Sequence, residues 1–234
     1  MTEALYLKDS YLKEWDAVVR CVDGNQVVLD RTAFYPAGGG QPTDTGIMTY
    51  KSKEYKVLSV KKIGPDILHE TNETGLATGD VVHCRLDWNR RYVLMRMHTA
   101  AHLLCAIINS ETGALITGNQ LDIGQSRIDF SLEKFDKDKL IDYISKANNY
   151  IRQDLHVKVY SLPREEAIKI PGITKLATGL PAELRELRIV EIPGVDIQAD
   201  GGTHVKSLKE IGTIRFVRAE NKGKNNRRVY YSLT

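Results

Sequence analysis

The segment from Asp87 to Asn109 constrains the fold of this chain more than any other stretch of its 234 residues. Apolar residues recur along it at the three- and four-residue spacing that is typical of one helix face. They are Val93, Leu94, Met97, Ala101, Leu104 and Ile108. Asp87 is a suitable N-cap, because its carboxylate can accept hydrogen bonds from the free N–H groups of a first helical turn. The pattern therefore predicts a long helix that starts near Asp87.

Two histidines, His98 and His102, lie four positions apart within this helix. At that spacing two side chains stack on one face, so both rings lean toward the same point and can present nitrogens to a divalent metal. Such a pair on its own is more often incidental or hydrogen-bonded. The protease signature H-E-x-x-H is not present, because the pair lacks its glutamate. A metal site therefore needs a further ligand from another part of the chain.

A candidate for that ligand is the segment Asp200-Gly-Gly-Thr-His204. Two adjacent glycines permit a sharp turn and a close approach of the backbone to a ligand. Asp200 and His204 flank the turn, so a carboxylate and an imidazole can point into the same space. His204 alone would be read as a hydrogen-bonded loop histidine. With three of the chain's six histidines in two compact motifs, a metal site is favoured, and the imidazoles favour zinc.

A third motif, Gly38-Gly-Gly-Gln41, lies in the segment 34–46. It is not a nucleotide-binding P-loop, because no Gly-Lys-Ser/Thr follows it. Taken together, the three motifs resemble the editing region of alanyl-tRNA synthetases and, more closely, the free-standing AlaX trans-editing proteins. They occur in the family's order, and the resemblance covers nearly the whole chain. The family usually carries cysteine at the position where this chain has Asp200.

The resemblance implies a zinc-dependent hydrolase that clears alanine tRNA wrongly charged with serine or glycine. It implies that Zn2+ is bound by His98, His102 and His204, with Asp200 in the place of the cysteine. Asp200 is then an oxygen ligand, an orienter of a histidine or a general base for water, and the first role is favoured. A carboxylate in place of a thiolate is expected to weaken the preference for zinc somewhat.

The resemblance also implies roles for residues outside the metal motifs. Gly39, Gly40 and Gln41 are expected to contact the editing pocket and help to tell serine from alanine. Gln120 and Thr203 are expected to contact the substrate, and Gln120, like Asp200, to take part in catalysis. Two simpler interpretations stay open, namely a flexible turn for the glycines and an exposed turn amide for Gln120.

The sequence predicts an α+β fold in two domains, 1–86 and 87–234. Short segments rich in β-branched and aromatic residues, separated by turns, predict a small antiparallel β-barrel in the first domain. These strands are expected at Ala4–Leu7, Glu14–Val22, Gln26–Asp30, Ile47–Tyr50, Glu54–Lys61, Ile67–Glu70 and Val81–Asp87. The second domain is expected to combine helices with a central antiparallel sheet, and to carry the editing site.

Helices and strands alternate in the predicted second domain. Besides the histidine helix, helices are expected at Asp136–Asp154, Arg164–Ile170 and from Pro181, with a brief turn or helix within Val205–Ile211. Strands are expected at Ser126–Ser131, which closes a hairpin, at Leu155–Leu162 and Leu187–Ile192, and in a final hairpin of Thr213–Glu220 with Arg228–Leu233.

A basic segment near the C-terminus contains Lys222, Lys224, Arg227 and Arg228. The net charge of +3 does not by itself indicate a nucleic-acid-binding protein. The segment is interpreted either as a solvated hairpin turn or as a contact to the phosphates of tRNA.

The rest of the composition points to the cytoplasm. Apolar stretches are too short to span a bilayer, and the start does not resemble a signal peptide. The scattered cysteines Cys21, Cys84 and Cys105 predict buried thiols in a reducing compartment instead of disulfides.

Three functions remain in competition: a trans-editing zinc hydrolase, a zinc-ordered tRNA-binding module without hydrolysis, and a zinc hydrolase of another small ester or amide. The first is preferred. The chain has no room for an adenylation domain, so it is not expected to charge tRNA. The oligomeric state, and the choice between serine and glycine, stay open.

Overall fold

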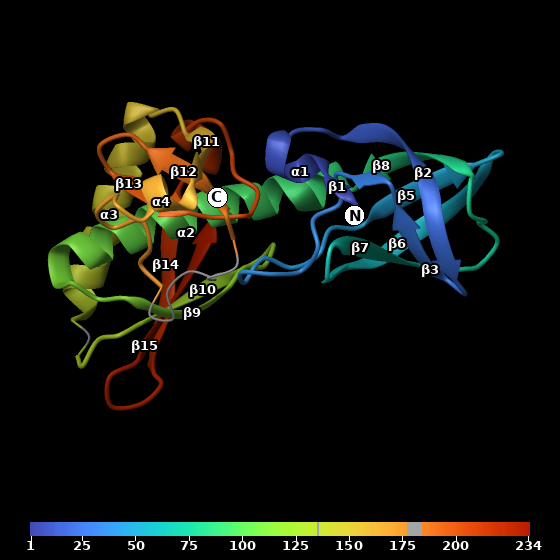
Figure 1. The fold of residues 1–234 in the computed structure, drawn as a ribbon. Helices are drawn as coiled ribbons and strands as arrows, with labels where there is room; N and C mark the ends of the chain where they lie inside the picture. Colours follow the sequence, from blue (N-terminus) through green and yellow to red (C-terminus); the bar gives the residue numbers. More distant parts are fainter. Residues whose placement is uncertain (135, 177–183) are drawn as a thin grey trace. The chain divides into compact units, whose positions relative to one another are not determined.

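The computed structural model describes residues 1–134, 136–176 and 184–234. The chain divides into two compact units, Met1–Leu94 and Met95–Thr234 (Figure 1). The division falls inside helix α2, Trp88–Thr112, eight residues beyond the boundary that we expected after residue 86. The first turns of this helix therefore belong to the first unit, and the part that carries the histidines belongs to the second.

The first unit contains the predicted barrel. Six strands close it in the order β2-β3-β7-β6-β5-β8, and each neighbouring pair is antiparallel. They are β2 (Glu14–Asp23), β3 (Gln26–Leu29), β5 (Gly46–Tyr50), β6 (Lys53–Ile63), β7 (Asp66–Thr71) and β8 (Val81–Leu86). Along β2 the side chains of Trp15, Ala17 and Val19 point inward and those between them point to solvent. This alternation is the sequence signal from which the barrel was predicted.

One predicted strand is wrong. Residues Ala4–Leu7 form the end of a two-residue strand, β1 (Glu3–Ala4), and most of a helical turn, α1 (Leu5–Lys8). β1 pairs in parallel with β4 (Arg31–Thr32). The turn of helix buries Tyr6, whose ring meets Tyr35 edge-on at 5.2 Å between centroids. Packing of this aromatic pair therefore decides the local structure, and strand propensity does not.

Helix α2 begins where the sequence predicted. The Asp87 carboxylate accepts a hydrogen bond from the Arg90 N–H at 3.1 Å. One turn later the fully buried Arg91 binds the Asp44 carboxylate and donates to the carbonyl oxygens of Ala33 (2.5 Å) and Ser10 (3.0 Å). The guanidinium thus attaches the first turns of α2 to the barrel and to the segment that follows the glycine motif.

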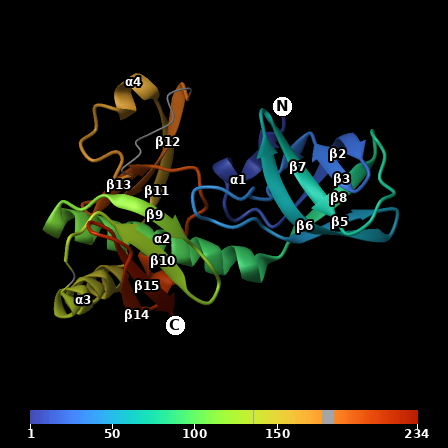
Figure 2. The same ribbon diagram turned by 90° about the horizontal axis from the view of Figure 1, so that it is seen from below.

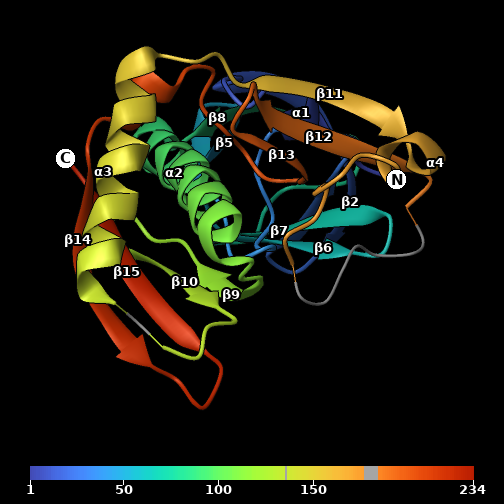
Figure 3. The same cartoon turned by 90° about the vertical axis from the view of Figure 1, so that its left-hand side faces the viewer.

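The second unit has α+β architecture, as predicted, with its antiparallel strands in two sheets. The four-stranded sheet has the order β14-β15-β10-β9, and the three-stranded sheet the order β11-β12-β13. Helix α2 lies between them (Figure 3): Tyr231 of β15 donates to the Met97 carbonyl on one side, and Asp196 of β13 meets His102 on the other. The strands are β9 (Ile116–Gln120), β10 (Ser126–Phe130), β11 (Lys158–Pro163), β12 (Glu186–Ile192), β13 (Asp196–Ala199), β14 (Ile214–Asn221) and β15 (Arg227–Leu233).

Helix α3 (Lys137–Gln153) confirms the helix predicted at Asp136–Asp154 and packs along β14 (Figure 2). Asn148 joins the two elements, because its amide bonds both the N–H and the C=O of Ile214 at 2.9 Å. The short elements α4 (Arg164–Ala167) and the 3-10 turn η1 (Leu208–Ile211) complete the unit. Helix α4 is shorter than the predicted helix Arg164–Ile170, and η1 confirms the brief turn or helix predicted within Val205–Ile211.

Some predicted element bounds and the burial of one cysteine differ from the structure. The predicted strand Leu155–Leu162 begins only at Lys158, after the left-handed Asp154 that ends α3. The first residues of the helix predicted from Pro181 lie outside the described residues, and Glu186 already belongs to β12. Cys84 and Cys105 are buried as predicted, whereas Cys21 is exposed, because a register shift between Val19 and Cys21 interrupts the inward–outward alternation of β2. None of the helices that the structure describes is long and apolar enough to cross a membrane.

Candidate metal centre

The two histidine motifs meet in the second unit. His98 and His102 come from α2, and Asp200 and His204 come from the loop that follows β13. One potential ligand atom from each of the four lies within 4.8 Å of the others. The three histidines are buried, and the Asp200 side chain is 22% exposed. The structure therefore brings together all four residues that the sequence proposed as metal ligands.

The histidine nitrogens converge on the Asp200 carboxylate. Nε2 of His204 lies 3.1 Å from Oδ1, and Nε2 of His98 and His102 lie 3.6 and 3.8 Å from Oδ2. Ligands about 2.0–2.1 Å from a tetrahedral zinc ion are about 3.3–3.4 Å from one another. The three nitrogen–oxygen spacings are close to the edges of such a tetrahedron, and the four ligand atoms all lie within 4.8 Å of one another. The four side chains therefore fit a divalent ion of this size.

Gly202 has a steric role in this cluster. A Cβ atom at this position would lie 2.2 Å from Cε1 of His98 and 2.5 Å from its Nδ1, so no side chain fits there. At Gly201 a Cβ atom would meet nothing within 4 Å. The loop also closes on itself, because the Gly202 N–H donates to Asp200 Oδ1 at 2.6 Å. The second glycine of the pair thus lets the backbone pass directly against the His98 ring.

Two of the histidine rings are held from behind. The Thr99 hydroxyl donates to the Met95 carbonyl at 3.0 Å, so it accepts from Nδ1 of His204 at 3.2 Å. Nδ1 of His102 donates to Asp196 Oδ2 at 3.0 Å, since a carboxylate can only accept. Both rings therefore carry a hydrogen on Nδ1 and turn Nε2 toward the cluster.

Burial and neighbouring charge shift the cluster's pKa values in opposite directions. Burial lowers the pKa of His98 to about 4, and burial with the adjacent His98 holds the pKa of His204 well below its usual value. Burial also disfavours charge on His102, but hydrogen bonds to Asp196 and Asp200 outweigh it and raise its pKa to about 9. Burial opposes ionisation of Asp200, yet the surrounding histidines lower its pKa well below normal. The cluster thus favours an ionised Asp200 beside neutral His98 and His204, whereas a metal that binds His102 must displace the proton from its Nε2.

The other predicted substrate contacts lie in different surroundings. Thr203 is fully buried between Gly202 and His204 of the same loop. Gln120 is exposed at the end of edge strand β9, where its side-chain oxygen accepts from Arg127 Nε at 3.3 Å. It is not among the four residues of the cluster. Thr203 is thus adjacent in the chain to His204 of the cluster, and Gln120 has the exposed position that the alternative interpretation describes.

The glycine motif forms a tight turn in the first unit. Gly38 and Gln41 exchange backbone hydrogen bonds at 3.1 and 2.9 Å, and Gly39 and Gly40 between them have φ of +58° and +86°. The Tyr35 hydroxyl closes the turn by donating to the Gly38 carbonyl at 3.0 Å. Gln41 is buried. The two glycines are therefore required by backbone conformation, since a Cβ atom at Gly39 would meet only the Tyr35 hydroxyl, 4.0 Å away.

The basic segment is the end of the β14–β15 hairpin. Arg227 is buried and donates to Asn221 Oδ1 and to the carbonyls of Gly223 and Asn226, and so shapes the turn. Arg228 makes a bidentate ion pair with Asp129 at 2.7 and 2.8 Å. Lys222 lies 3.6 Å from Glu220 and is exposed, as is Lys224. The two arginines therefore have intramolecular partners, and the two lysines present charge to solvent.

The hydrogen-bond partners of Nδ1 in His204 and His102 were not predicted from the sequence. Thr99 lies inside the histidine motif, but nothing in the sequence pairs it with His204, 105 residues away. Asp196 and Lys175 likewise reach the cluster only through the folded chain. The available signal was weak: Asp196 and Gln198 alternate with apolar residues along β13, which places them on the same face.

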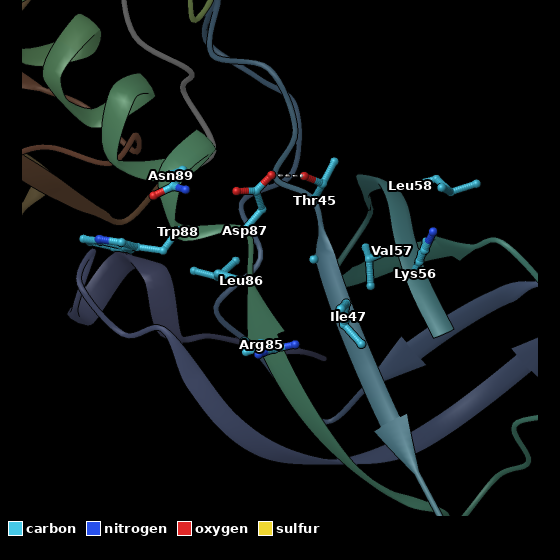
Figure 4. A pocket seen from close by; sticks show the side chains of 11 residues that line it. Thr45, Ile47, Lys56, Val57, Leu58, Arg85, Leu86, Asp87, Trp88 and Asn89 are labelled. Carbon is cyan, nitrogen blue, oxygen red and sulfur yellow. Dashed lines mark hydrogen bonds between the residues drawn. The ribbon is translucent and has the colours of Figure 1, made fainter. Parts of the chain in front are cut away.

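A groove of about 560 Å³ lies entirely in the first unit. It is formed where β5, β6 and β8 meet the first residues of α2 (Figure 4). Gly46 permits this meeting, because a Cβ atom there would lie 2.2 Å from the Arg85 carbonyl oxygen. Its walls are mainly apolar, with two cations, and are lined by Thr45, Gly46, Ile47, Lys56, Val57, Leu58, Arg85, Leu86, Asp87, Trp88 and Asn89.

The chain is similar to proteins of translation over its whole length. Residues 4–90 match the family described as tRNA synthetases class II (A), and residues 187–230 match the threonyl and alanyl tRNA synthetase second additional domain. The alanyl-tRNA editing protein AlaX-M of Methanosarcina barkeri is 51% identical over 100% of this chain and 99% of that protein. That of Saccharolobus solfataricus is 49% identical with the same coverage. The alanine–tRNA ligase of Pyrococcus furiosus is 40% identical over 94% of this chain, which matches 24% of the ligase.

Proposed function

The chain belongs to the AlaX family of alanyl-tRNA editing proteins, and on that premise we propose that it hydrolyses the ester of tRNA(Ala) mischarged with serine or glycine. A synthetase site for alanine discriminates poorly against glycine, because the two amino acids differ by one methyl group, and hydrolysis of the product corrects the error. Its substrate is an aminoacyl-tRNA, so the proposed place of action is the cytoplasm.

The cofactor proposed for this reaction is a zinc ion. Support comes from three buried imidazoles whose Nε2 atoms face one carboxylate at spacings close to those of a tetrahedral site. When bound, zinc supplies Lewis acidity beside the ester carbonyl. In this assignment His98, His102 and His204 hold the ion and Asp200 completes the set as an oxygen ligand. Asp200 is also the member of the cluster most open to solvent, so the substrate ester is proposed to approach from its side.

The substrate roles are proposed for residues of both units. Thr203 directly precedes His204 and is proposed to contact the aminoacyl group. Gln41 with the turn of Gly39 and Gly40 is proposed to contribute to selectivity between serine and alanine. Gln120 is proposed as a further substrate contact with a part in catalysis.

The tRNA itself is proposed to meet the end of the β14–β15 hairpin. The exposed ammonium groups of Lys222 and Lys224 suit contacts to phosphate. Arg227 and Arg228 are proposed to act there chiefly by holding the hairpin in shape, because both guanidiniums are engaged within the protein.

The observation that carries the proposal is the convergence of the four predicted ligands. The test is deacylation of seryl-, glycyl- and alanyl-tRNA(Ala) by the purified chain, with His204→Ala as the control that removes one ligand. We expect the first two substrates, and not the third, to be hydrolysed, with activity lost in the variant. Binding of tRNA without hydrolysis would instead identify a binding module. Hydrolysis of small esters alone would identify a different zinc hydrolase.

A further inference from the structure

Behind the His102 ring lies the buried carboxylate of Asp196 on β13. We infer that Asp196, held in place by Lys175 and Gln198, is a positioning residue that fixes the orientation and tautomer of His102 for metal binding. The inference rests on the proposed metal site. It concerns a residue that does not itself reach the reacting atoms.

Asp196 is fully engaged by hydrogen bonds. Its Oδ2 accepts from Nδ1 of His102 at 3.0 Å and from the Gln198 amide at 2.9 Å. Its Oδ1 accepts from Nζ of Lys175 at 2.5 Å. No part of the Asp196 side chain is exposed. A carboxylate bound at both oxygens cannot rotate without breaking one of these bonds, so it offers His102 an acceptor in one fixed place.

The fixed acceptor sets the tautomer of His102. A neutral imidazole carries one hydrogen, and the Asp196 carboxylate retains it on Nδ1 because it can only accept. The Nε2 lone pair is then left for the metal, on the side where Asp200 Oδ2 lies 3.8 Å away. Outer carboxylates that act on metal-bound histidines in this way also raise the basicity of the ligand nitrogen.

Lys175 holds the second oxygen of the Asp196 carboxylate in place. Its ammonium group is also buried, and it donates to the Gly172 carbonyl at 3.4 Å besides Asp196. Without this cation the carboxylate would keep only the two bonds on Oδ2, from His102 and Gln198, and could turn away from the His102 ring. Lys175 therefore belongs to the same hydrogen-bonded group.

The first measurement is zinc affinity of the full chain, by competition with a chromogenic chelator and without tRNA. We expect Asp196→Asn to weaken zinc binding about 10- to 100-fold, because the asparagine amide can donate to Nδ1 and place the ring hydrogen on Nε2. Lys175→Met is expected to weaken zinc binding in the same direction. Asp129→Asn is the matched control, since Asp129 is a buried carboxylate paired with two arginines outside the cluster. Its zinc affinity should equal that of the wild type.

A second measurement does not depend on how well a variant folds. In the wild-type chain labelled with 15N-histidine and loaded with zinc, two-bond proton–nitrogen spectra should show His102 protonated at Nδ1 and bound through Nε2. Binding through Nδ1, or wild-type zinc affinity in folded Asp196→Asn, would overturn the inference. Normal zinc binding without deacylation would overturn the proposed function and leave the role of Asp196 intact.

Discussion

At the scale of single residues, the two glycines of the metal loop are expected to differ sharply. Gly202→Ala places a methyl group 2.2 Å from the His98 ring, so the ring or the loop must move, whereas Gly201→Ala adds a methyl group in open space. We expect the first variant to lose most of its zinc and activity and the second to keep both. Zinc content after gel filtration measures the difference. Equal zinc in the two variants would show that the loop relaxes without disturbing the site.

The role of Asp200 is separable by two substitutions. If the carboxylate is a ligand, Asp200→Cys should retain zinc and part of the activity, because a thiolate also binds zinc. Asp200→Ala should bind zinc more weakly, with three histidines left. If Asp200 is instead a general base, Asp200→Cys should hold zinc normally and hydrolyse poorly. Zinc titration together with single-turnover deacylation distinguishes the two roles.

The four candidate ligands were predictable and their supporting residues were not. His98 and His102 are related by helix periodicity, and Asp200 and His204 by a turn of two glycines, so each pair is set by local chain geometry. Asp196 reaches His102 across 94 positions of sequence. That contact depends on how β13 packs against α2, and no local pattern encodes it.

At the scale of elements, the turn of the glycine motif is expected to affect selectivity. Gln41→Ala should narrow the ratio of seryl- to alanyl-tRNA hydrolysis, because a hydrogen bond to the serine hydroxyl is worth roughly 1–3 kcal/mol, about ten- to a hundredfold in rate. Gly39→Val should act likewise by distorting the turn, since β-branched residues avoid positive φ. Gly39→Asn is the control, because asparagine tolerates that conformation. If the rates of seryl- and alanyl-tRNA hydrolysis fall by the same factor in these variants while zinc content is unchanged, the motif serves folding or tRNA docking.

Strands of the barrel and the helices α2 and α3 were predictable because their apolar residues follow one period without interruption. The prediction of a strand at Ala4–Leu7 was wrong because a single aromatic contact, between Tyr6 and Tyr35, determines the conformation of so short a segment. The division of the second unit's strands into two sheets was not foreseen either. Both sheets have similar alternation, and their partition depends on α2, which separates them.

At the scale of the whole molecule, the barrel should become less stable in mild acid because of His69. This histidine is fully buried, with its ring between Thr32 Oγ1 and the Val27 carbonyl, and burial lowers its pKa to about 4 from 6.5. The unfolded chain therefore binds a proton more readily between these values. The stabilisation that comes from keeping His69 neutral is complete above pH 6.5. As the pH falls toward 4, the free energy of unfolding decreases by about 3 kcal/mol at most.

The measurement is urea unfolding at several pH values, followed by tryptophan fluorescence. Both tryptophans, Trp15 and Trp88, belong to the first unit, so the signal reports on the barrel. His69→Gln should reduce the pH dependence between 4 and 6.5, since glutamine does not titrate. A difference between wild type and variant that is constant across this range would contradict the assignment.

The donor set of the metal cluster has a consequence for chemical resistance. Sulfur ligands are open to oxidation by peroxide, which converts thiolates to acids that no longer bind zinc, whereas imidazole and carboxylate are not attacked in this way. The cluster contains nitrogen and oxygen donors alone, and burial raises the pKa of the thiols of Cys84 and Cys105, so both are poorly reactive. Peroxide should therefore oxidise Cys21 first and leave zinc and deacylation unchanged, while Asp200→Cys should lose both. Asp200 stands where relatives are expected to carry an oxidisable cysteine. With a carboxylate there, this chain should keep its zinc and its activity under oxidative stress.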